Sequence, residues 1–275
     1  MTAPLYDAHA HLADPRLEPY RGAIEQSLKE INCQQTVVNG TSPADWHAVV
    51  EYTKSSGKSL PAIGLHPWQV KDAPADWKAQ FSQLLNTGAV TVIGEIGLDQ
   101  WIEGHDIEQQ QAAFKWQLEV ATQRNLPVSI HCLRAMQPLL ETLLTAQLPQ
   151  RGIHLHAFNG SAEDARRLVE LGAYFSFNAG QLKPNAKTVF EAIRAIPEDR
   201  LLIETDAPDM LPPSEYREFE LPPAKSSTRL LNHPANLHAA YKAIADIRST
   251  SFNQLAIQVE QNFQRYFIQT LREHI

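Results

Sequence analysis

Residues 7–11 of this 275-residue chain read Asp7-Ala8-His9-Ala10-His11 and follow the short apolar run 4–6. Side chains two residues apart lie on the same face of a β-strand, so a first strand here would point His9 and His11 in the same direction. Two neutral imidazoles side by side can bind one divalent ion. Taken alone, the pattern fits a chance alternation in a flexible N-terminus better than a metal site, so the interpretation depends on ligand-type residues downstream.

Strand patterns and helix patterns alternate along the rest of the chain. After the first strand, apolar runs predict strands at 36–38, 60–65, 89–93, 126–130, 152–156, 172–177 and 200–205. Helical spacing and start signals predict helices at 21–31, 42–54, 75–85, 106–124, 138–148, 162–171 and 186–196, then a long loop at 210–229 and two amphipathic helices within 235–274. Eight buried strands, each followed by a helix or a connection of helical length, predict an α/β fold, a (β/α)8 TIM barrel that forms a single domain over residues 1–275.

The composition is that of an acidic globular protein. Lys plus Arg number 24 and Asp plus Glu number 31, so the formal charge is −7, opposite in sign to the usual nucleic-acid-binding protein. The two cysteines, Cys33 and Cys132, are too few for a disulfide framework, which predicts a cytoplasmic protein with reduced thiols. No run approaches the roughly 20 apolar residues of a membrane span, so we expect no membrane insertion. No stable protein partner is inferred from the sequence.

Ligand-type side chains stand where the predicted strands end. They are His9, His11, His66, Glu95, His131, His156 and Asp206. Each has an ordinary alternative, because a single His can be half-buried in a core and a strand-end carboxylate can cap the next helix. In a barrel, however, the carboxyl ends of all strands converge on one mouth. Such a cluster would cost several kcal/mol to bury unless cations neutralised it, which predicts a metal site there.

The same residues lie in motifs that resemble the TatD family of metal-dependent deoxyribonucleases, a branch of the amidohydrolase superfamily. The matching segments are 7–12 (DAHAHL), 63–67 (IGLHP), 93–99 (IGEIGLD), 130–132 (IHC), 156–161 (HAFNGS) and 203–208 (IETDAP). The resemblance extends from residue 7 to about residue 236. It implies a hydrolase that cleaves phosphodiester bonds, with a DNA end or single-stranded DNA as substrate and a 3'–5' exonuclease type of action.

The resemblance also implies the metal ligands. One divalent ion would be held by His9, His11 and Asp206, and a second by His131 and His156, with Glu95 bridging them. Nitrogen and oxygen donors suit Zn, Mn or Mg, so the identity of the two ions stays open among these three metals.

Catalytic roles follow from the same resemblance. Two metals would activate a hydroxide for attack on phosphorus, with Glu95 between them. Asp206 would accept the proton and His66 would hold the phosphate. Glu204 shares the strand face of Asp206 one layer deeper, where we expect it to support a histidine through a hydrogen bond.

Three segments depart from the family pattern, and all of them concern the substrate rather than the metals. They are Leu133-Arg134-Ala135, Asn232-His233-Pro234 and Ala157-Phe158-Asn159, which follows His156. Together with the acidic charge, they keep a second hypothesis open, a hydrolase of small esters, amides or phosphoesters. A barrel with purely structural metals is the third, disfavoured by the complete ligand set. For a nucleic-acid substrate, the candidate contacts are His66, Arg134, Lys183, Lys225 and Arg229 for phosphates, and Trp68 and Trp101 for unpaired bases.

Overall fold

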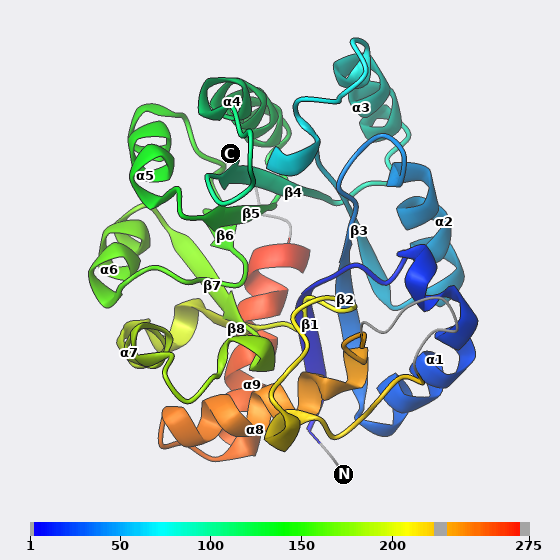
Figure 1. Cartoon of the computed structure of the whole chain (residues 1–275), viewed down its shortest axis with the longest axis vertical. Coiled ribbons are helices and arrows are strands. Elements are labelled where there is room, and N and C mark those ends of the chain that lie inside the picture. Colours follow the sequence, from blue (N-terminus) through cyan, green and yellow to red (C-terminus); the bar gives the residue numbers. More distant parts are fainter. Residues whose placement is uncertain (1–2, 223–229, 270–275) are drawn as a thin grey trace.

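A computed structural model describes residues 3–222 and 230–269, in which eight parallel strands form one sheet in sequence order (Figure 1). The strands are β1 (Leu5–Ala10), β2 (Cys33–Asn39), β3 (Ser59–Ile63), β4 (Val92–Asp99), β5 (Val128–Leu133), β6 (Ile153–Leu155), β7 (Ala173–Phe177) and β8 (Leu201–Ile203). The sheet curls into a nearly closed barrel, which confirms the predicted (β/α)8 architecture. That residues 1–275 form one domain stays a prediction.

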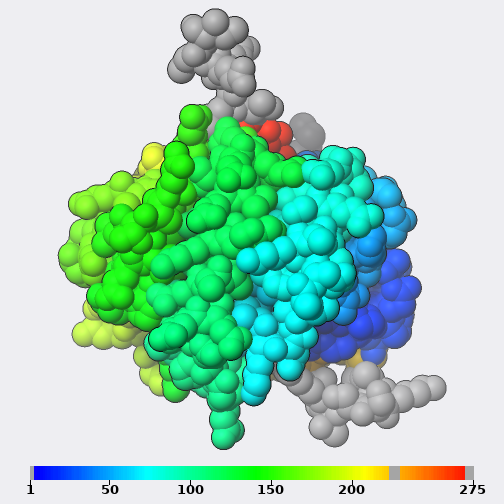
Figure 2. Space-filling model, turned by 90° about the horizontal axis from the view of Figure 1, so that it is seen from above, coloured from blue at the N-terminus to red at the C-terminus, as the bar shows by residue number. Residues whose placement is uncertain are grey.

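Helices alternate with the strands and surround them. They are α1 (Arg21–Glu30), α2 (Trp46–Ser56), α3 (Trp77–Asn86), α4 (Ile107–Arg124), α5 (Met136–Thr145), α6 (Ala162–Glu170), α7 (Lys187–Ala195), α8 (Leu237–Ile247) and α9 (Phe252–Phe263). A short 3-10 turn, η2 (Pro67–Gln69), follows β3, and another, η6 (Pro234–Asn236), precedes α8. Seen from the side of α3, α4 and α5, the helices form a continuous outer surface, coloured cyan to green in Figure 2.

The first and last strands meet at the barrel mouth. The amide of Asp206 donates to the carbonyl of His9 at 2.9 Å, and the amide of His11 donates to the carbonyl of Ala207 at 2.7 Å. The buried carboxylate of Asp7 accepts hydrogen bonds from the amide and hydroxyl of Thr205, at 3.1 and 2.7 Å. These bonds fix the chain after β8 beside the end of β1.

Local sequence signals predict one helix start correctly and another wrongly. Helix α6 begins at Ala162, as the sequence predicts, and Ser161 caps it in a capping box with Asp164. The predicted start of α2 at Ser42 is wrong by several residues. Asp45 accepts hydrogen bonds from the amides of Thr41 and Ser42, which holds the preceding turn, and the helix begins only at Trp46.

Strand β4 differs most from its predicted range of 89–93. It begins at Val92 and continues through Asp99, so Glu95 lies within the strand rather than after it. Gly97 pairs with His131 of β5 at a φ of +143°, and a Cβ atom there would lie 2.0 Å from the carbonyl oxygen of His131. Only glycine permits this approach, which continues the ladder toward the mouth.

The opposite end of the barrel is filled by aromatic residues from α9 and the turn that follows it. Phe263, Tyr266 and Phe267 are buried against Tyr6 and Tyr174 from the strands. The Tyr266 hydroxyl donates to the carbonyl of Val128 at 2.7 Å and accepts from its amide at 3.0 Å. Figure 1 shows α9 in red crossing the ring of strands.

Within the described ranges, no helix has both the length and the apolar character that crossing a membrane requires. Cys33 and Cys132 are free thiols. The cytoplasmic location stays a prediction.

Candidate metal centre

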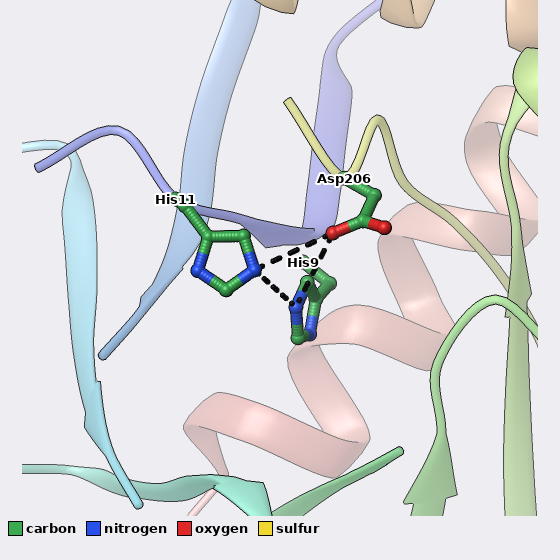
Figure 3. Close-up of side chains that lie close together, drawn as sticks. All are labelled: His9, His11 and Asp206. Carbon is green, nitrogen blue, oxygen red and sulfur yellow. Dashed lines mark hydrogen bonds and ion pairs between the residues drawn. The ribbon is translucent and has the colours of Figure 1, made fainter. Parts of the chain in front are cut away.

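His9 and His11, the β1 histidine pair, face the carboxylate of Asp206 across the junction of β1 and β8 (Figure 3). Their Nε2 atoms are 3.3 Å apart, and Oδ1 of Asp206 lies 3.7 Å from that of His9 and 3.4 Å from that of His11. Asp206 has a φ of +52°, a left-handed conformation that Asp tolerates better than most residues. The two imidazoles therefore converge on one point, as the spacing of two predicts.

Glu95 lies at the centre of the cluster, and its two oxygens face different histidines. Oε2 is 3.4 Å from the Nε2 atom of each member of the β1 histidine pair. Oε1 is 3.2 Å from Nε2 of His66, 3.0 Å from Nδ1 of His131 and 2.8 Å from Nε2 of His156. The side chain is almost completely buried. Glu95 therefore lies between the β1 histidine pair on one side and His66, His131 and His156 on the other.

Three overlapping groups among the described residues bring their ligand atoms within 4.8 Å of one another. They are His9, His11 and Asp206; His9, Glu95 and His156; and His66, Glu95 and His131. All seven side chains singled out from the sequence therefore meet in one place. The first group coincides with the predicted first metal site, and the other two share Glu95.

Hydrogen bonds to the far ring nitrogens distinguish the histidines. Nδ1 of His11 lies 3.0 Å from the carbonyl of Asn39, and Nε2 of His131 lies 2.8 Å from a carboxylate oxygen of Asp99. Carbonyl and carboxylate oxygens only accept, so these nitrogens carry protons, and in each neutral ring the other nitrogen is left with a lone pair facing the cluster. In His66 the two ring nitrogens have the opposite roles. Its Nδ1 accepts from the amide of Trp68 at 3.1 Å, so in the neutral ring Nε2 carries the proton and is a donor.

Burial and neighbouring charges shift the pKa values of the side chains in the cluster. Burial alone would raise the pKa of Glu95, but the neighbouring His66 and His156 outweigh it and hold that pKa well below its usual range. Burial raises the pKa of Asp206, partly offset by its bond to His11. Burial keeps the pKa of His9 well below its usual range, and the charge of His156 lowers it further. The rings of these two histidines stack with their centroids 3.8 Å apart. A neutral His9 beside an ionised Glu95 is the protonation state that binds cations.

Asp99 also belongs to the motif 93–99, which on its own predicts no role for this side chain. Its Oδ2 accepts from His131 and from Nε1 of Trp68, both at 2.8 Å. Its Oδ1 accepts from the amides of Trp101 at 2.6 Å and Ile102 at 3.0 Å. Burial raises its pKa, but the bond to His131 outweighs this and lowers the pKa to about 2. The even spacing from Glu95 on one strand was the signal that could have found it.

Glu204 lies deeper, as predicted, but the expected hydrogen bond to a histidine is absent. Its Oε1 is 3.7 Å from Nδ1 of His156, and that nitrogen has no hydrogen-bond partner among the described residues. The carboxylate instead accepts from the amide of Ala157 at 2.9 Å, from Asn178 at 3.0 Å and from the hydroxyl of Ser176. Glu204 therefore holds the backbone beside His156 rather than its ring.

The other predicted substrate contacts fall into two sets. Arg134 and Lys183 are exposed, while Lys225 and Arg229 lie outside the described residues. Trp68 and Trp101, the predicted contacts to unpaired bases, have 41% and 53% of their surfaces exposed. Both tryptophans remain available for contacts with a substrate.

A family model described as TatD related DNase matches residues 6–268. The chain belongs to this family. A metal-dependent hydrolase of Bacillus subtilis, YabD, is 29% identical over 263 residues, covering 96% of this chain and 98% of the relative. A protein of Pectobacterium parmentieri, named 3'-5' ssDNA/RNA exonuclease TatD, is 27% identical over 268 residues, covering 96% and 99%. The crystal structure of the TatD homologue YjjV from Escherichia coli superimposes with a TM-score of 0.88 at 25% identity, covering 98% of this chain and all of that one. As a member of the TatD family, the chain is a metal-dependent hydrolase.

Proposed function

We propose that the chain is a deoxyribonuclease that needs two divalent ions and removes nucleotides from single-stranded DNA ends in the 3'–5' direction. The observation that carries the proposal is the position of Glu95, whose two oxygens face two sets of histidines. A shared carboxylate between two cations is the arrangement of binuclear phosphodiester hydrolysis. The names of the family model and of the Pectobacterium relative support DNA as the substrate.

The donor set fits divalent ions. The cluster offers imidazole nitrogens and carboxylate oxygens, which suit Zn or Mn and, less well, Mg. Cys132 is no competitor, because it packs against the core and burial raises the pKa of its thiol to about 12. We assign His9, His11 and Asp206 to one ion, His131 and His156 to the other, and Glu95 to both.

Asp206, besides being a ligand, and His66, which is not assigned as one, have tasks in the reaction. When bound, the two ions would activate water as a nucleophile and stabilise negative charge on the phosphate. Asp206 has a pKa raised by burial, which suits it to accept the proton of the attacking water. Nε2–H of His66 would donate to a phosphate oxygen, because the bond from the Trp68 amide to Nδ1 makes Nε2 the protonated nitrogen.

A hydrolase of small esters, amides or phosphoesters is the second candidate. The net charge of −7 favours it, because a protein that repels polyanions gains little from long-range attraction to DNA. The same metal centre would serve either substrate, so the site geometry alone does not separate them.

The test combines metal analysis with two substrates. We expect the purified protein to bind two equivalents of Mn or Zn and to shorten labelled single-stranded DNA from its 3' end. Glu95→Gln should bind less metal and lose activity while the fold is kept, whereas Glu170→Gln, an exposed change on α6, should match the wild type. Hydrolysis of bis(p-nitrophenyl) phosphate without DNA cleavage would favour the second candidate. Full metal content and activity in Glu95→Gln would refute the shared-ligand assignment.

A further inference from the structure

Two exposed tryptophan rings lie beside the metal centre. Trp68 follows His66 in η2, and Trp101 follows β4; their ring centroids are 6.0 Å apart with planes inclined by 33°. We call these two side chains the Trp platform. The ring of Trp68 also lies against two imidazoles of the cluster, with centroids 5.2 Å from His66 and 6.4 Å from His131. The Trp platform therefore lies directly beside the metal centre.

The buried carboxylate of Asp99 connects the Trp platform to the metal centre. Oδ2 of Asp99 accepts from the Trp68 indole and from His131, and its Oδ1 accepts from the backbone amide of Trp101. Large aromatic surfaces normally lie in the core, and leaving two of them in water has a free-energy cost. Here one hydrogen bond holds the ring of Trp68 and another anchors the backbone of Trp101, both to a residue that also orients a metal-site histidine. Such a pre-arranged surface favours a ligand that covers the rings while another part of it reaches the metals.

We propose that the Trp platform stacks on an unpaired nucleobase of the strand whose phosphate lies at the metal centre, an inference that rests on the proposed function. Stacking needs no positive charge and accepts every base, so it provides affinity that an acidic protein does not obtain from phosphate contacts. A paired base within a duplex offers no free face, so the platform also selects single-stranded ends. A cleft of about 200 Å³ beside Trp68, between η2 and the loop after β4, leaves room next to the ring.

The test is a double-mutant cycle between the protein and the DNA. Trp101→Ala removes one ring but keeps the bond to Asp99, which comes from the backbone. A short single-stranded DNA with cleavage-resistant phosphorothioate linkages carries an abasic nucleotide at each terminal position in turn. Binding is measured by fluorescence anisotropy in Mn²⁺. For the wild type, the abasic nucleotide at one position should weaken binding about 5- to 150-fold, and in Trp101→Ala the same nucleotide should have much less effect.

Controls and contrary outcomes separate this inference from the proposed function. Trp101→Phe should restore most of the coupling, and Leu144→Ala, which removes an exposed apolar side chain on α5, should behave as the wild type. Cleavage of normal DNA with additive effects in the cycle would refute the platform and leave the nuclease. Coupled binding without cleavage would support the platform and refute the nuclease. A wild type that neither binds nor cleaves single-stranded DNA would overturn both.

Discussion

Asp99 and His131 form a hydrogen bond of 2.8 Å, in which Nε2 of the imidazole donates to Oδ2 of the carboxylate. In the neutral ring, the bond leaves Nδ1 without a proton, 3.0 Å from Oε1 of Glu95. Two acceptors at that distance repel each other unless a cation lies with them. If His131 is a ligand, as proposed above, Asp99 is the positioning residue that leaves its Nδ1 free for the metal.

Asp99→Asn should weaken metal binding about 10- to 100-fold, because a carboxamide has one acceptor oxygen for four donors. Titration calorimetry with Mn²⁺ measures the loss. Glu103→Gln, an exposed change in the same loop, is the matched control and should bind as the wild type. Equal affinities in all three proteins would remove Asp99 from the metal centre.

Asp206→Asn should lower kcat about 10²- to 10⁴-fold, the range expected when a proton acceptor is lost. Glu204→Gln should lower it much less, because the amide oxygen still accepts from Ala157 and Asn178, and the amide group can face the Ser176 hydroxyl. Steady-state rates on bis(p-nitrophenyl) phosphate compare them. Similar losses in both variants would show that Asp206 has no special part in proton transfer.

Metal affinity should fall as the pH is lowered. Burial lowers the pKa values of His11, His131 and His156, but bonds and charges from neighbouring carboxylates outweigh it and raise all three. Because a raised pKa means that the proton is held to higher pH, cations compete with protons already near neutrality. Calorimetry in buffers of different ionisation enthalpy should detect proton release on Mn²⁺ binding. Binding without proton release at neutral pH would contradict these shifts.

His233 should make the protein less stable in mild acid. Burial lowers its pKa to about 4, whereas an unfolded chain has the usual value near 6.5. Between these values the unfolded state binds the extra proton, so the free energy of unfolding decreases as the pH falls from 6.5 toward 4. The loss from pH 7 to pH 5 is at most about 2 kcal/mol, since part of the ring is solvated.

Denaturant unfolding at both pH values checks this prediction in wild type and His233→Asn. Asparagine keeps an acceptor for the amide of Ala235, which His233 caps through Nδ1 at 3.0 Å, but it has no proton to gain. The variant should therefore lose less stability on acidification than the wild type. An equal decrease in both proteins would show that other groups carry the acid sensitivity.

The positions of the ligand-type residues were predictable because they depend on local signals. An apolar run followed by a His or Asp marks the end of a buried strand, and in a parallel barrel all such ends meet. The convergence of His9 and His156, 147 positions apart in the sequence, follows from that topology alone. Their ring stacking and the assignment of protons do not, because they depend on what the far nitrogens contact.

The missed features depend on contacts between distant segments. Ala89 and Val90 have strand-like side chains, yet the ladder with β3 begins only at Val92, opposite Ala62. The continuation of β4 past Glu95 depends on the approach of Gly97 to His131, which no single segment encodes. The even spacing from Glu95 places Asp99 on the same strand face, but its hydrogen bonds form only because β5 and η2 bring donors to it.

Phe263, Tyr266 and Phe267 fill the base of the strand ring with buried side chains, so the ring encloses a packed core and not a pore. A polymer therefore cannot pass through the molecule as a thread passes through a ring. It must present an end or a bend at the mouth, and each product must leave by the route along which its substrate arrived. A product that keeps its contacts at the mouth would block the next substrate, so product inhibition should be competitive.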